Sequence, residues 1–268
     1  MLKLKDHLED IYNLYTKENY NIKQISDLYN CYPQSVTNAL KTKDPNITFT
    51  HNRGNVNYFN KIDSQNKAYL LGFIAADGCL TQLNKTGNPR FLLTITIHKK
   101  DIDLLYFLKK EIGCENPVYE LKRDNLVRFT ISSKQISSDL INLGIVPKKS
   151  LILKDITKNI NSEFKESFLL GYFDGDGSIY SSNNKYYISI RGTKECLESY
   201  NKTLGLNVNI LTYDSTYRWV IGNKEGILKF YNSLYIKNPP DFFLNRKYEK
   251  FISFIKDKCQ DQTISSPS

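Results

Sequence analysis

Residues 69–80 of this sequence read YLLGFIAADGCL, and residues 168–179 read FLLGYFDGDGSI. Both stretches contain an aromatic residue, two leucines, a glycine and two apolar residues, and both continue through small or acidic residues to Asp-Gly. Asp77 and Asp176 occupy the same place in the two copies. Self-similarity within a chain indicates a repeated structural unit, so the sequence predicts two related halves.

The segments that follow each copy also correspond. Alternating apolar residues predict strands, and apolar residues spaced three or four apart predict helices. The expected elements span 90–100, 101–113, 117–123, 125–132 and 133–144 in the first half, and 185–194, 195–205, 206–214, 216–222 and 223–235 in the second. Each half therefore reads α-β-β-α-β-β-α. We expect an α+β fold in which one chain, as a monomer, forms a pseudo-two-fold pair of halves.

The repeated stretch is apolar around most of its circumference, which is typical of a buried helix. Gly72 and Gly171 need a packing reason, because a glycine inside a helix costs about 1 kcal/mol relative to alanine. We expect the two helices to pack together at the dyad, each glycine facing its twin. Each helix should then end at Asp-Gly, with the glycine as its C-terminal cap. Asp77 and Asp176 would emerge side by side.

Paired carboxylates facing a phosphate are a ligand set for Mg²⁺, which is bound through one or two carboxylates and phosphate oxygens. Such an ion activates water and stabilises the leaving oxygen in phosphodiester hydrolysis. The alternative is that each aspartate only ends a packed helix. Two matched copies in a basic chain favour the metal site.

The composition of the chain narrows the class of protein. Lys and Arg exceed Asp and Glu by 37 to 28, a net charge of +9, and the isoelectric point is about 9.1. A basic protein favours polyanions, above all nucleic acid. The sequence has no long apolar run and no signal-like N-terminus, so we expect no membrane partner and a cytoplasmic location. Five dispersed cysteines argue against a disulfide framework and a structural zinc site.

The two copies resemble the paired motifs of the LAGLIDADG homing endonucleases, in the single-chain form that carries both motifs, over about residues 62–255. The resemblance implies two β-sheets that form a saddle on double-stranded DNA. It implies Mg²⁺-dependent cleavage, with Mn²⁺ as a substitute, at a long asymmetric site, leaving short 3′ overhangs. The last acid of each motif, here Asp77 and Asp176, would be catalytic and would bind the metal with the backbone of Ala76 and Gly175. Asp174 is less essential, since its counterpart is Ala75.

The resemblance extends beyond the motifs. The segments INLGIVPKKS and DFFLNRKYEKF look like the ends of the family's two halves. A basic residue at the end of the last strand of each half would polarise the scissile phosphate, and we assign Lys134 and Lys224 to this role, against the alternative of two solvated surface lysines. His98 and Arg191 end the second strand of each half and are candidates for the same water pocket.

The strands would read DNA through the side chains of one face, and a shift of one residue would invert the set. Basic side chains can pair guanine, and amides can pair adenine. The expected contacts are Gln82, Asn84, Lys85, Arg90, Thr94, Thr96, His98, Lys122, Arg123 and Arg128 in the first half, and Lys185, Tyr187, Ser189, Arg191, Tyr213 and Arg218 in the second.

Residues 1–43 lie outside the repeat, and their apolar spacing predicts three short helices. The pattern resembles a helix-turn-helix, a small all-α domain whose third helix begins at Pro33. The expected DNA contacts on it are Gln34, Ser35, Thr37, Asn38 and Lys41. The alternative is a structural or partner-binding cap. The remaining boundaries are a linker at 44–60, halves at 61–150 and 151–258, and a flexible tail at 259–268.

Three functions remain open from the sequence. The first is a site-specific homing endonuclease, as in intron homing. The second is a catalytically silent DNA-binding regulator on the same fold, which the presence of both motif aspartates disfavours. The third is an RNA-splicing maturase, because the family includes such proteins; RNA would then be a further partner.

Overall fold

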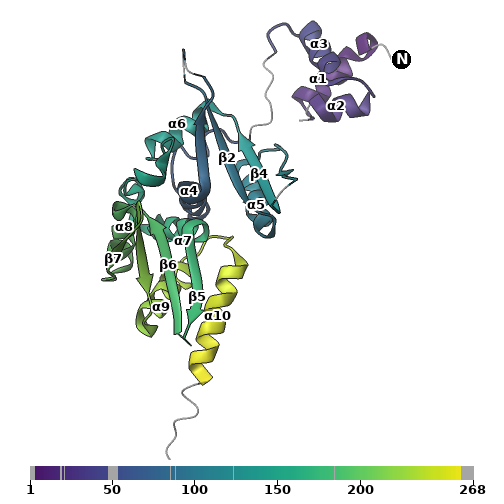
Figure 1. Ribbon diagram of the computed structural model, residues 1–268. Helices are drawn as coiled ribbons and strands as arrows, with labels where there is room; N and C mark the ends of the chain where they lie inside the picture. Colours follow the sequence, from purple (N-terminus) through teal and green to yellow (C-terminus); the bar gives the residue numbers. More distant parts are fainter. Residues whose placement is uncertain are drawn as a thin grey trace, which may run out of the picture. The chain divides into compact units, whose positions relative to one another are not determined.

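The computed structural model describes residues 4–18, 20, 22–47, 54–84, 86, 87, 89–122, 124–183 and 185–260, although not the side chains of residues 23 and 257–260. The chain divides into two compact units, residues 1–53 and 54–268 (Figure 1). Two of the expected DNA contacts, Lys85 and Arg123, lie outside the described residues, as do residues 261–268 of the expected tail.

The N-terminal unit contains the three expected helices. A short 3-10 turn, η1 (Leu4–His7), precedes α1 (Leu8–Thr16), α2 (Ile22–Leu28) and α3 (Pro33–Lys43). Proline suits the first position of α3 because its missing N–H has no partner there in any helix. Ile11, Ile25, Val36 and Leu40 form the small core of this unit.

The larger unit contains two copies of the same element order, as expected from the sequence. The first copy is α4 (Gln65–Asp77), β1 (Gly78–Gln82), β2 (Phe91–His98), η2 (Lys99–Asp101), α5 (Ile102–Ile112), β3 (Tyr119–Glu120), β4 (Leu126–Ile131) and α6 (Lys134–Asn142). The second copy is α7 (Lys165–Asp176), β5 (Gly177–Ser182), β6 (Lys185–Gly192), α8 (Lys194–Leu204), β7 (Ile210–Tyr213), β8 (Thr216–Ile221) and α9 (Lys224–Tyr231). Three 3-10 turns, η3 (Lys149–Leu151), η4 (Ile156–Asn159) and η5 (Ser162–Phe164), connect the copies. A π-helical turn, η6 (Asn232–Ile236), and α10 (Asn245–Gln260) follow the second.

Each copy forms one antiparallel four-stranded sheet, with strand order β1-β2-β4-β3 in the first and β5-β6-β8-β7 in the second. Leu93, Ile95 and Ile97 on β2 are buried, and the residues between them face away from the core. This alternation is typical of a sheet with helices on one face only. The α+β fold with a pseudo-two-fold pair of halves is therefore confirmed.

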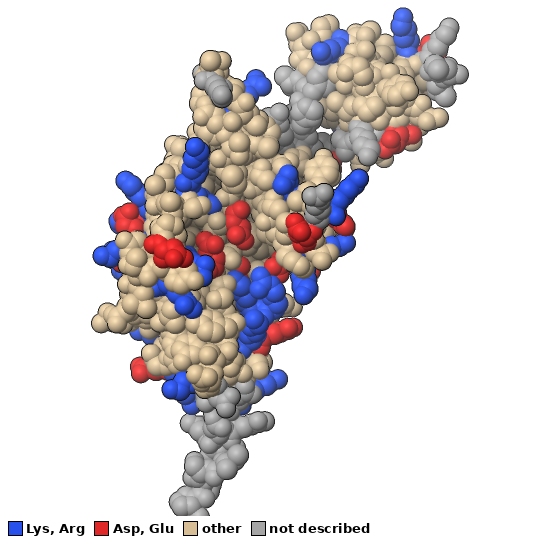
Figure 2. Space-filling model, viewed as in Figure 1, with Lys and Arg blue, Asp and Glu red and all other residues tan. Residues whose placement is uncertain are grey.

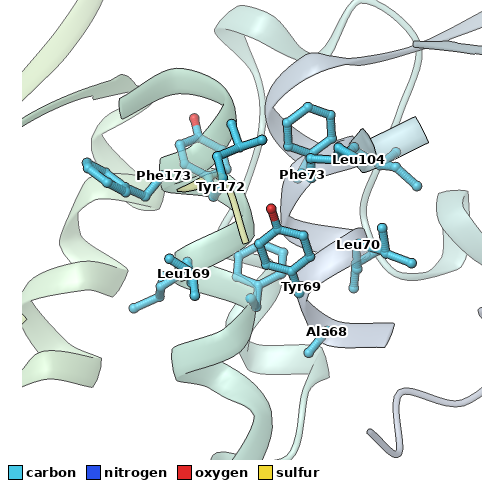
Figure 3. Packing of buried hydrophobic residues seen from close by; sticks show 14 of the residues in the cluster. Ala68, Tyr69, Leu70, Phe73, Leu104, Leu169, Tyr172 and Phe173 are labelled. Atoms are coloured by element: carbon cyan, nitrogen blue, oxygen red, sulfur yellow. The ribbon is translucent and has the colours of Figure 1, made fainter. Parts of the chain in front are cut away.

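The helices α4 and α7 pack against each other at the centre of this unit, and their side chains diverge into the two halves. Figure 3 shows Leu70 beside Leu104 in the first half, and Leu169 and Phe173 directed into the second. A Cβ on Gly72 would lie 2.0 Å from the backbone oxygen of Phe168, and one on Gly171 would lie 1.9 Å from that of Tyr69. Each glycine therefore abuts the backbone one turn before its twin rather than the twin itself.

The glycines after the two aspartates are the C-caps of α4 and α7, as expected. Gly78 has φ −72° and ψ 144°, and Gly177 has φ −91° and ψ 157°, so both are extended and begin β1 and β5. Glycine is required there by space, because a Cβ on Gly78 would lie 2.6 Å from Ile74 and one on Gly177 would lie 2.1 Å from Phe173. The chain thus turns from helix to strand directly under each aspartate.

The expected linker is shorter than 44–60. Tyr58 and Phe59 are buried in the core of the larger unit, and Asn55 N–H bonds to the Ile112 oxygen. At the other end, α10 continues to Gln260, past the expected boundary at residue 258. None of the described helices is both long and apolar enough to span a membrane.

Candidate active site

The two motif aspartates are the last residues of the packed helices, as expected. Asp77 ends α4 and Asp176 ends α7, and both reach solvent. They lie close to the dyad, because a Cβ on Gly175 would be 2.3 Å from that of Ala76 and 3.4 Å from the Asp77 carboxylate. The surrounding protein and, second, the charge of Asp176 raise the pKa of Asp77 to about 6. A cation beside the two carboxylates would lower the pKa of Asp77 again and favour its charged form.

Two buried lysines lie under these aspartates. Lys149 Nζ donates hydrogen bonds to the oxygens of Ala76 (2.9 Å) and Gly78 (2.5 Å). Lys247 Nζ donates to the oxygens of Phe173 (2.5 Å), Asp174 (2.7 Å) and Gly177 (2.7 Å). Each lysine therefore binds carbonyl oxygens at the point where a helix ends and a strand begins; the Phe173 oxygen also accepts the Gly177 N–H.

The charges of the lysines act across the dyad. Asp176 raises the pKa of Lys149 more than Asp77 does, although Lys149 is bonded to the end of α4. Lys247, bonded to the end of α7, in turn lowers the pKa of Asp77 more than Lys149 does. Burial outweighs these attractions and lowers the pKa of Lys247 to about 8. Of the two lysines, the one bonded to the end of the other helix therefore has the larger effect on each carboxylate: Lys247 on Asp77, and Lys149 on Asp176.

Lys149 and Lys247 were not among the site residues predicted from the sequence, although both lie in the segments that resemble the ends of the family's two halves. Lys149 is the second lysine of INLGIVPKKS, and Lys247 follows Arg246 in DFFLNRKYEKF. The signal that could have found them is that each segment follows the last helix of its half and carries adjacent basic residues.

Lys134 and Lys224 lie elsewhere. They are exposed and begin α6 and α9, beyond the ends of β4 and β8. On β2, Ile95 is opposite Gly78, the residue after Asp77. Ile131, at the end of β4, is opposite Leu93, which is two residues closer to the start of β2. At about 3.3 Å per residue, the register puts Lys134 several residue lengths from Asp77 along the sheet. Among the described residues, the structure brings neither lysine into contact with an aspartate of the motifs.

The two backbone groups expected at the metal differ in their surroundings. The Ala76 oxygen accepts the hydrogen bond from Lys149, so an ammonium group already lies where a metal ion was expected. The hydrogen bonds of Lys247 go instead to the oxygens of Phe173, Asp174 and Gly177. Gly175 is therefore the better of the two backbone candidates.

Asp174 is a buried connector rather than a group that faces the site. It is 1% exposed, and its Oδ2 accepts hydrogen bonds from the Tyr69 hydroxyl (2.7 Å) and the Leu244 N–H (2.9 Å). Asp174 thus joins α7, α4 and the segment before α10. Burial raises its pKa to about 6. Ala75, its counterpart, can make none of these bonds.

A cavity of about 210 Å³ adjoins Asp176. Its lining includes Ala76 and Lys149 from one side, and Tyr172 and Arg191 from the other. The sheet register also shows which residue of the first half corresponds to Arg191. Gly177 pairs with Ile190 and Gly78 pairs with Ile95, so Arg191 corresponds to Thr96.

His98, which the sequence analysis placed with Arg191, corresponds instead to Thr193, and each of the two begins the next helical element. His98 Nδ1 accepts the Lys100 N–H (3.1 Å) as the N-cap of η2, and the Thr193 side chain accepts the Cys196 N–H as the N-cap of α8. The two residues thus serve as equivalent caps, and Arg191 alone of the proposed pair lines the cavity beside Asp176.

The open faces of the two sheets carry most of the residues expected to contact DNA. Thr94, Thr96 and His98 alternate with buried residues on β2, and Arg128 Nε donates to Thr96 Oγ1 (3.2 Å) across the sheet. On the second sheet the shared open face holds Lys185, Tyr187, Ser189, Arg191, Tyr213 and Arg218. The other expected contacts lie at strand ends and in turns, namely Gln82, Asn84, Arg90 and Lys122. Gln82 is two residues from the buried Leu80 and so belongs to the same face of β1.

The second sheet has a more ordered basic surface than the first. Arg218 donates to Ser189 Oγ and to the Tyr180 hydroxyl, both at 2.8 Å. Arg191 lies over the Tyr213 ring at 4.3 Å. Figure 2 shows further Lys and Arg side chains gathered over the first turns of α10. Arginines held in this way are ready to meet phosphate or a base edge without much loss of side-chain freedom.

On α3 of the N-terminal unit, one exposed stripe carries three of the five expected contacts. Gln34, Asn38 and Lys41 are exposed, and Gln34 Nε2 donates to Asn38 Oδ1 (3.1 Å). Ser35 and Thr37 are half-buried beside the core of this unit. The stripe suits a helix that lies in a groove of DNA.

The donor set at the dyad fits a divalent ion. In the part of the chain that the structure describes, no group of three or more His, Cys, Asp and Glu residues converges. Asp77 and Asp176 would therefore be the side-chain ligands, with water and substrate oxygens completing the shell. Mg²⁺ prefers such a site, because it keeps several waters and binds few carboxylates.

Comparison with known proteins gives the same two halves. The family model described as LAGLIDADG endonuclease matches residues 70–143, and the one described as LAGLIDADG-like domain matches residues 163–235. A protein named "DNA polymerase" from Acanthamoeba polyphaga mimivirus is 28% identical over 184 residues, which are 60% of this chain and 10% of that protein. The "Uncharacterized cox1 intron-2 37.2 kDa protein" of Schizosaccharomyces pombe is 25% identical over 226 residues, 72% of this chain and 64% of that protein. The chain thus spans less than two thirds of either curated relative.

Solved structures share the fold. The LAGLIDADG meganuclease I-AabMI bound to uncleaved DNA is 16% identical with a TM-score of 0.51, covering 75% of this chain and 93% of that one. The meganuclease I-SmaMI bound to uncleaveable DNA is 17% identical with a TM-score of 0.51, covering 76% of this chain and 91% of that one. At these identities the likeness concerns the fold alone.

Proposed function

Because this chain belongs to the LAGLIDADG endonuclease family in its two-motif form, we propose that it is a site-specific endonuclease that hydrolyses both strands of double-stranded DNA. The observation that carries the proposal is the pair of carboxylates, Asp77 and Asp176, that emerge together from two packed helices between two sheets with polar open faces. We further propose a monomer on a long asymmetric site and short 3′ overhangs, because the halves are alike in fold and differ in surface residues.

In the proposed reaction, water adds to the scissile phosphorus, the bond to the leaving oxygen breaks, and that oxygen takes up a proton. Asp77 and Asp176 would hold Mg²⁺, or Mn²⁺ in its place, and the ion would supply water activation and charge stabilisation. Lys149 and Lys247 fix the ends of the helices through their carbonyl bonds, and so fix the carboxylates. Their charges offset part of the negative charge that two acids and a phosphate bring together.

The direct test is cleavage of a randomised duplex library with Mg²⁺, followed by sequencing of the ends. The expected result is a set of defined ends that share one long sequence, with a constant short 3′ overhang. The matched control is the variant with Asp77→Asn and Asp176→Asn, which keeps the fold and the basic surface. Ends that are undefined, or that the control also produces, would contradict the proposal.

The N-terminal unit has a separate proposed role, which is additional DNA affinity through the exposed stripe of α3. Removal of residues 1–53 should weaken binding about tenfold or more, because lysine contacts and groove contacts are lost, and should leave the cleaved bonds unchanged. A gel-shift titration of both chains on the identified target measures the first effect, and end sequencing measures the second. A truncated chain that cuts elsewhere would show that this unit chooses the site.

RNA splicing is the second candidate function, and one observation favours it. The S. pombe relative is named as the product of a cox1 intron, which supports an intron origin for this chain as well. Binding of the chain to its own intron RNA, compared with a shuffled RNA of the same length, would test this candidate. Equal affinity for the two RNAs would contradict it.

A further inference from the structure

The chain enters the larger unit at one fixed point. Gly54 has a φ of +65°, and a Cβ on it would lie 2.0 Å from the Ile112 oxygen at the end of α5. Asn55 N–H bonds to the same oxygen at 2.6 Å. Only a glycine fits against this carbonyl with that backbone, so the path of the chain is set where it meets α5.

The residues that follow attach this point to the first half. Tyr58 is buried, and its hydroxyl donates to Glu111 Oε2 (2.6 Å) near the end of α5. Lys67, in α4, lies over the Tyr58 ring at 5.4 Å. These contacts are all with helices of the first half. The N-terminal unit is therefore tethered to the first half.

The tether between the two units is short. Ile47 packs on the core of the N-terminal unit, so 54 − 47 = 7 backbone steps separate it from Gly54. A fully extended chain of this length spans at most about 25 Å. The outer end of the first sheet lies within this distance, since β1 leads away from the dyad over five residues, or about 17 Å.

The outer end of the second sheet is much further from the tether. The helices α4 and α7 separate α5 from the second half, and Figure 3 shows Leu104 of α5 beside Leu70 of α4. Packed helix axes are about 9 Å apart, and the six residues of β5 span about 20 Å beyond the dyad. The outer end of the second sheet is thus about 35 Å or more from α5, along a path that must pass around the larger unit.

The N-terminal unit depends on this tether for its affinity. Residues 1–53 contain seven basic and six acidic residues, a net charge of only 7 − 6 = +1. The surface of α3 nevertheless suits a duplex, because Tyr32 at its N-cap is 83% exposed and Asn38 and Lys41 are exposed along it. A weak binding module on a short tether gains an effective concentration in the millimolar range, but only for DNA that the tether can reach.

We infer that the N-terminal unit binds a duplex segment that flanks the half-site of the first sheet, within about one helical turn of its end. The inference rests on the proposed DNA-binding function of both units. The target is then longer on the side of the first half than on the side of the second. The length of the tether, rather than the symmetry of the two halves, sets this difference.

The test is a hydroxyl-radical footprint of the full chain on its identified target in Ca²⁺. Arg128→Ala and Arg218→Ala each weaken protection in one half-site and so show which sheet contacts which end. The expected footprint extends further at the end that Arg128 marks. Shortening the duplex there by about ten base pairs should raise Kd about tenfold, and shortening the other end should change Kd by less than about twofold.

A variant with Asn38→Ala and Lys41→Ala should lose the additional protection and keep the rest of the footprint. Lys17→Ala, which removes an exposed lysine at the end of α1, is the matched control and should keep both. Thermal melts check that both variants fold. Additional protection at both ends, at the end that Arg218 marks, or at neither end would overturn the inference, as would additional protection that the double variant retains.

These outcomes are separate from a failure of the endonuclease proposal. Undefined ends in the library experiment would contradict site-specific cleavage alone. The target would then be selected from the same library by binding, and its footprint would test the inference in the same way.

Discussion

The central helices of the two halves are alike where they touch each other and different where they touch the rest of the chain. Gly72 and Gly171 both abut the backbone of the opposite helix, and both helices end in aspartate. Shortly before that aspartate, however, α4 has Ile74 and Ala75 where α7 has Phe173 and Asp174. The symmetric contact preserves identical residues, because each helix must solve the same packing problem.

The difference follows from what comes next in the chain. After the second half, the chain forms α10, and Leu244 before it donates to Asp174. After the first half, η3 and the connection to α7 occupy the corresponding place. The same position therefore has a polar partner in one half only. The two halves are therefore equivalent at the interface between α4 and α7, and they differ where these helices contact the rest of the chain. Four experiments compare the equivalent part with the part that differs.

The largest effect should come from the shared part. Asp77→Asn or Asp176→Asn should reduce double-strand cleavage at least about a hundredfold, because the amide is a poor ligand for Mg²⁺ and the charge at the phosphate changes. DNA binding should be kept, since it depends mainly on phosphate contacts of the basic surface. Bound and cut fractions in Ca²⁺ and in Mg²⁺ measure the two effects. Full cleavage by both folded variants would remove these aspartates from the reaction.

The two lysines should differ in their contribution to stability. Lys247→Met leaves three carbonyls and the buried Asp174 without their cation, whereas Lys149→Met leaves two carbonyls. An unpaired buried acceptor costs about 1–3 kcal/mol, and the Phe173 oxygen keeps its bond from the Gly177 N–H. We therefore expect a loss of about 3 kcal/mol in the free energy of unfolding for Lys247→Met and a smaller loss for Lys149→Met. Urea denaturation measures both. Equal losses would show that Asp174 and the third carbonyl add nothing.

Asp174 should make the stability of the chain depend on pH. Its pKa is raised to about 6 by burial, so the folded state holds the proton more tightly than the unfolded state does. That contribution is fully present below the pKa of the unfolded chain, near 4, and is lost as the pH rises through about 6. The Asp174→Asn side chain has no proton to lose and stays neutral. The free energy of unfolding of this variant, relative to that of the unmodified chain, should therefore rise by about 2 kcal/mol between pH 4.5 and pH 7.

The matched measurement is a pair of urea denaturation series at these two pH values. Asp77 titrates in a similar range and is present in both chains, so its contribution cancels in the difference. A stability difference that is independent of pH would show that Asp174 is ionised as easily in the folded chain as in the unfolded one.

The smallest effect should come from the hydroxyl that reaches across the dyad. Tyr69→Phe removes the bond to Asp174 and gives α4 the residue that α7 has at the same place, Phe168. The expected loss is about 1 kcal/mol in the free energy of unfolding, the usual contribution of one hydrogen bond. In the variant that also carries Asp174→Asn, the loss should shrink, since an amide accepts a weaker bond. An undiminished loss would mean that Tyr69 acts through packing alone.

Much of the architecture follows from local features of the sequence. The repeat, the element order of both halves and the three N-terminal helices were all predicted, because hydrophobic period and helix ends are set by residues close together in the chain. The motif aspartates could be placed for the same reason. The open faces of the strands also follow from alternation, and Thr94, Thr96 and Arg128 lie where it puts them.

Contacts between distant segments could not be predicted in this way. Lys149 bonds to Ala76 and Lys247 bonds to Gly177, about 70 residues away in each case. The adjacent basic residues in the segments that end each half are a local signal for these lysines, but their burial, in contrast to the exposed Lys134 and Lys224, depends on the distant carbonyls. Likewise, the place of His98 and Arg191 near the ends of the second strands suggested that they are equivalent, whereas the hydrogen-bond register makes Arg191 equivalent to Thr96.

The sequence by itself determined that this chain has two halves, where their helices and strands run, and which two acids meet at the dyad. The tertiary structure alone decided which cations lie beside those acids and how the pockets differ. The physical reason is that helices and strands are set by short-range hydrophobic period and hydrogen bonding. The burial of a lysine is decided by whether distant backbone carbonyls are brought together to receive it.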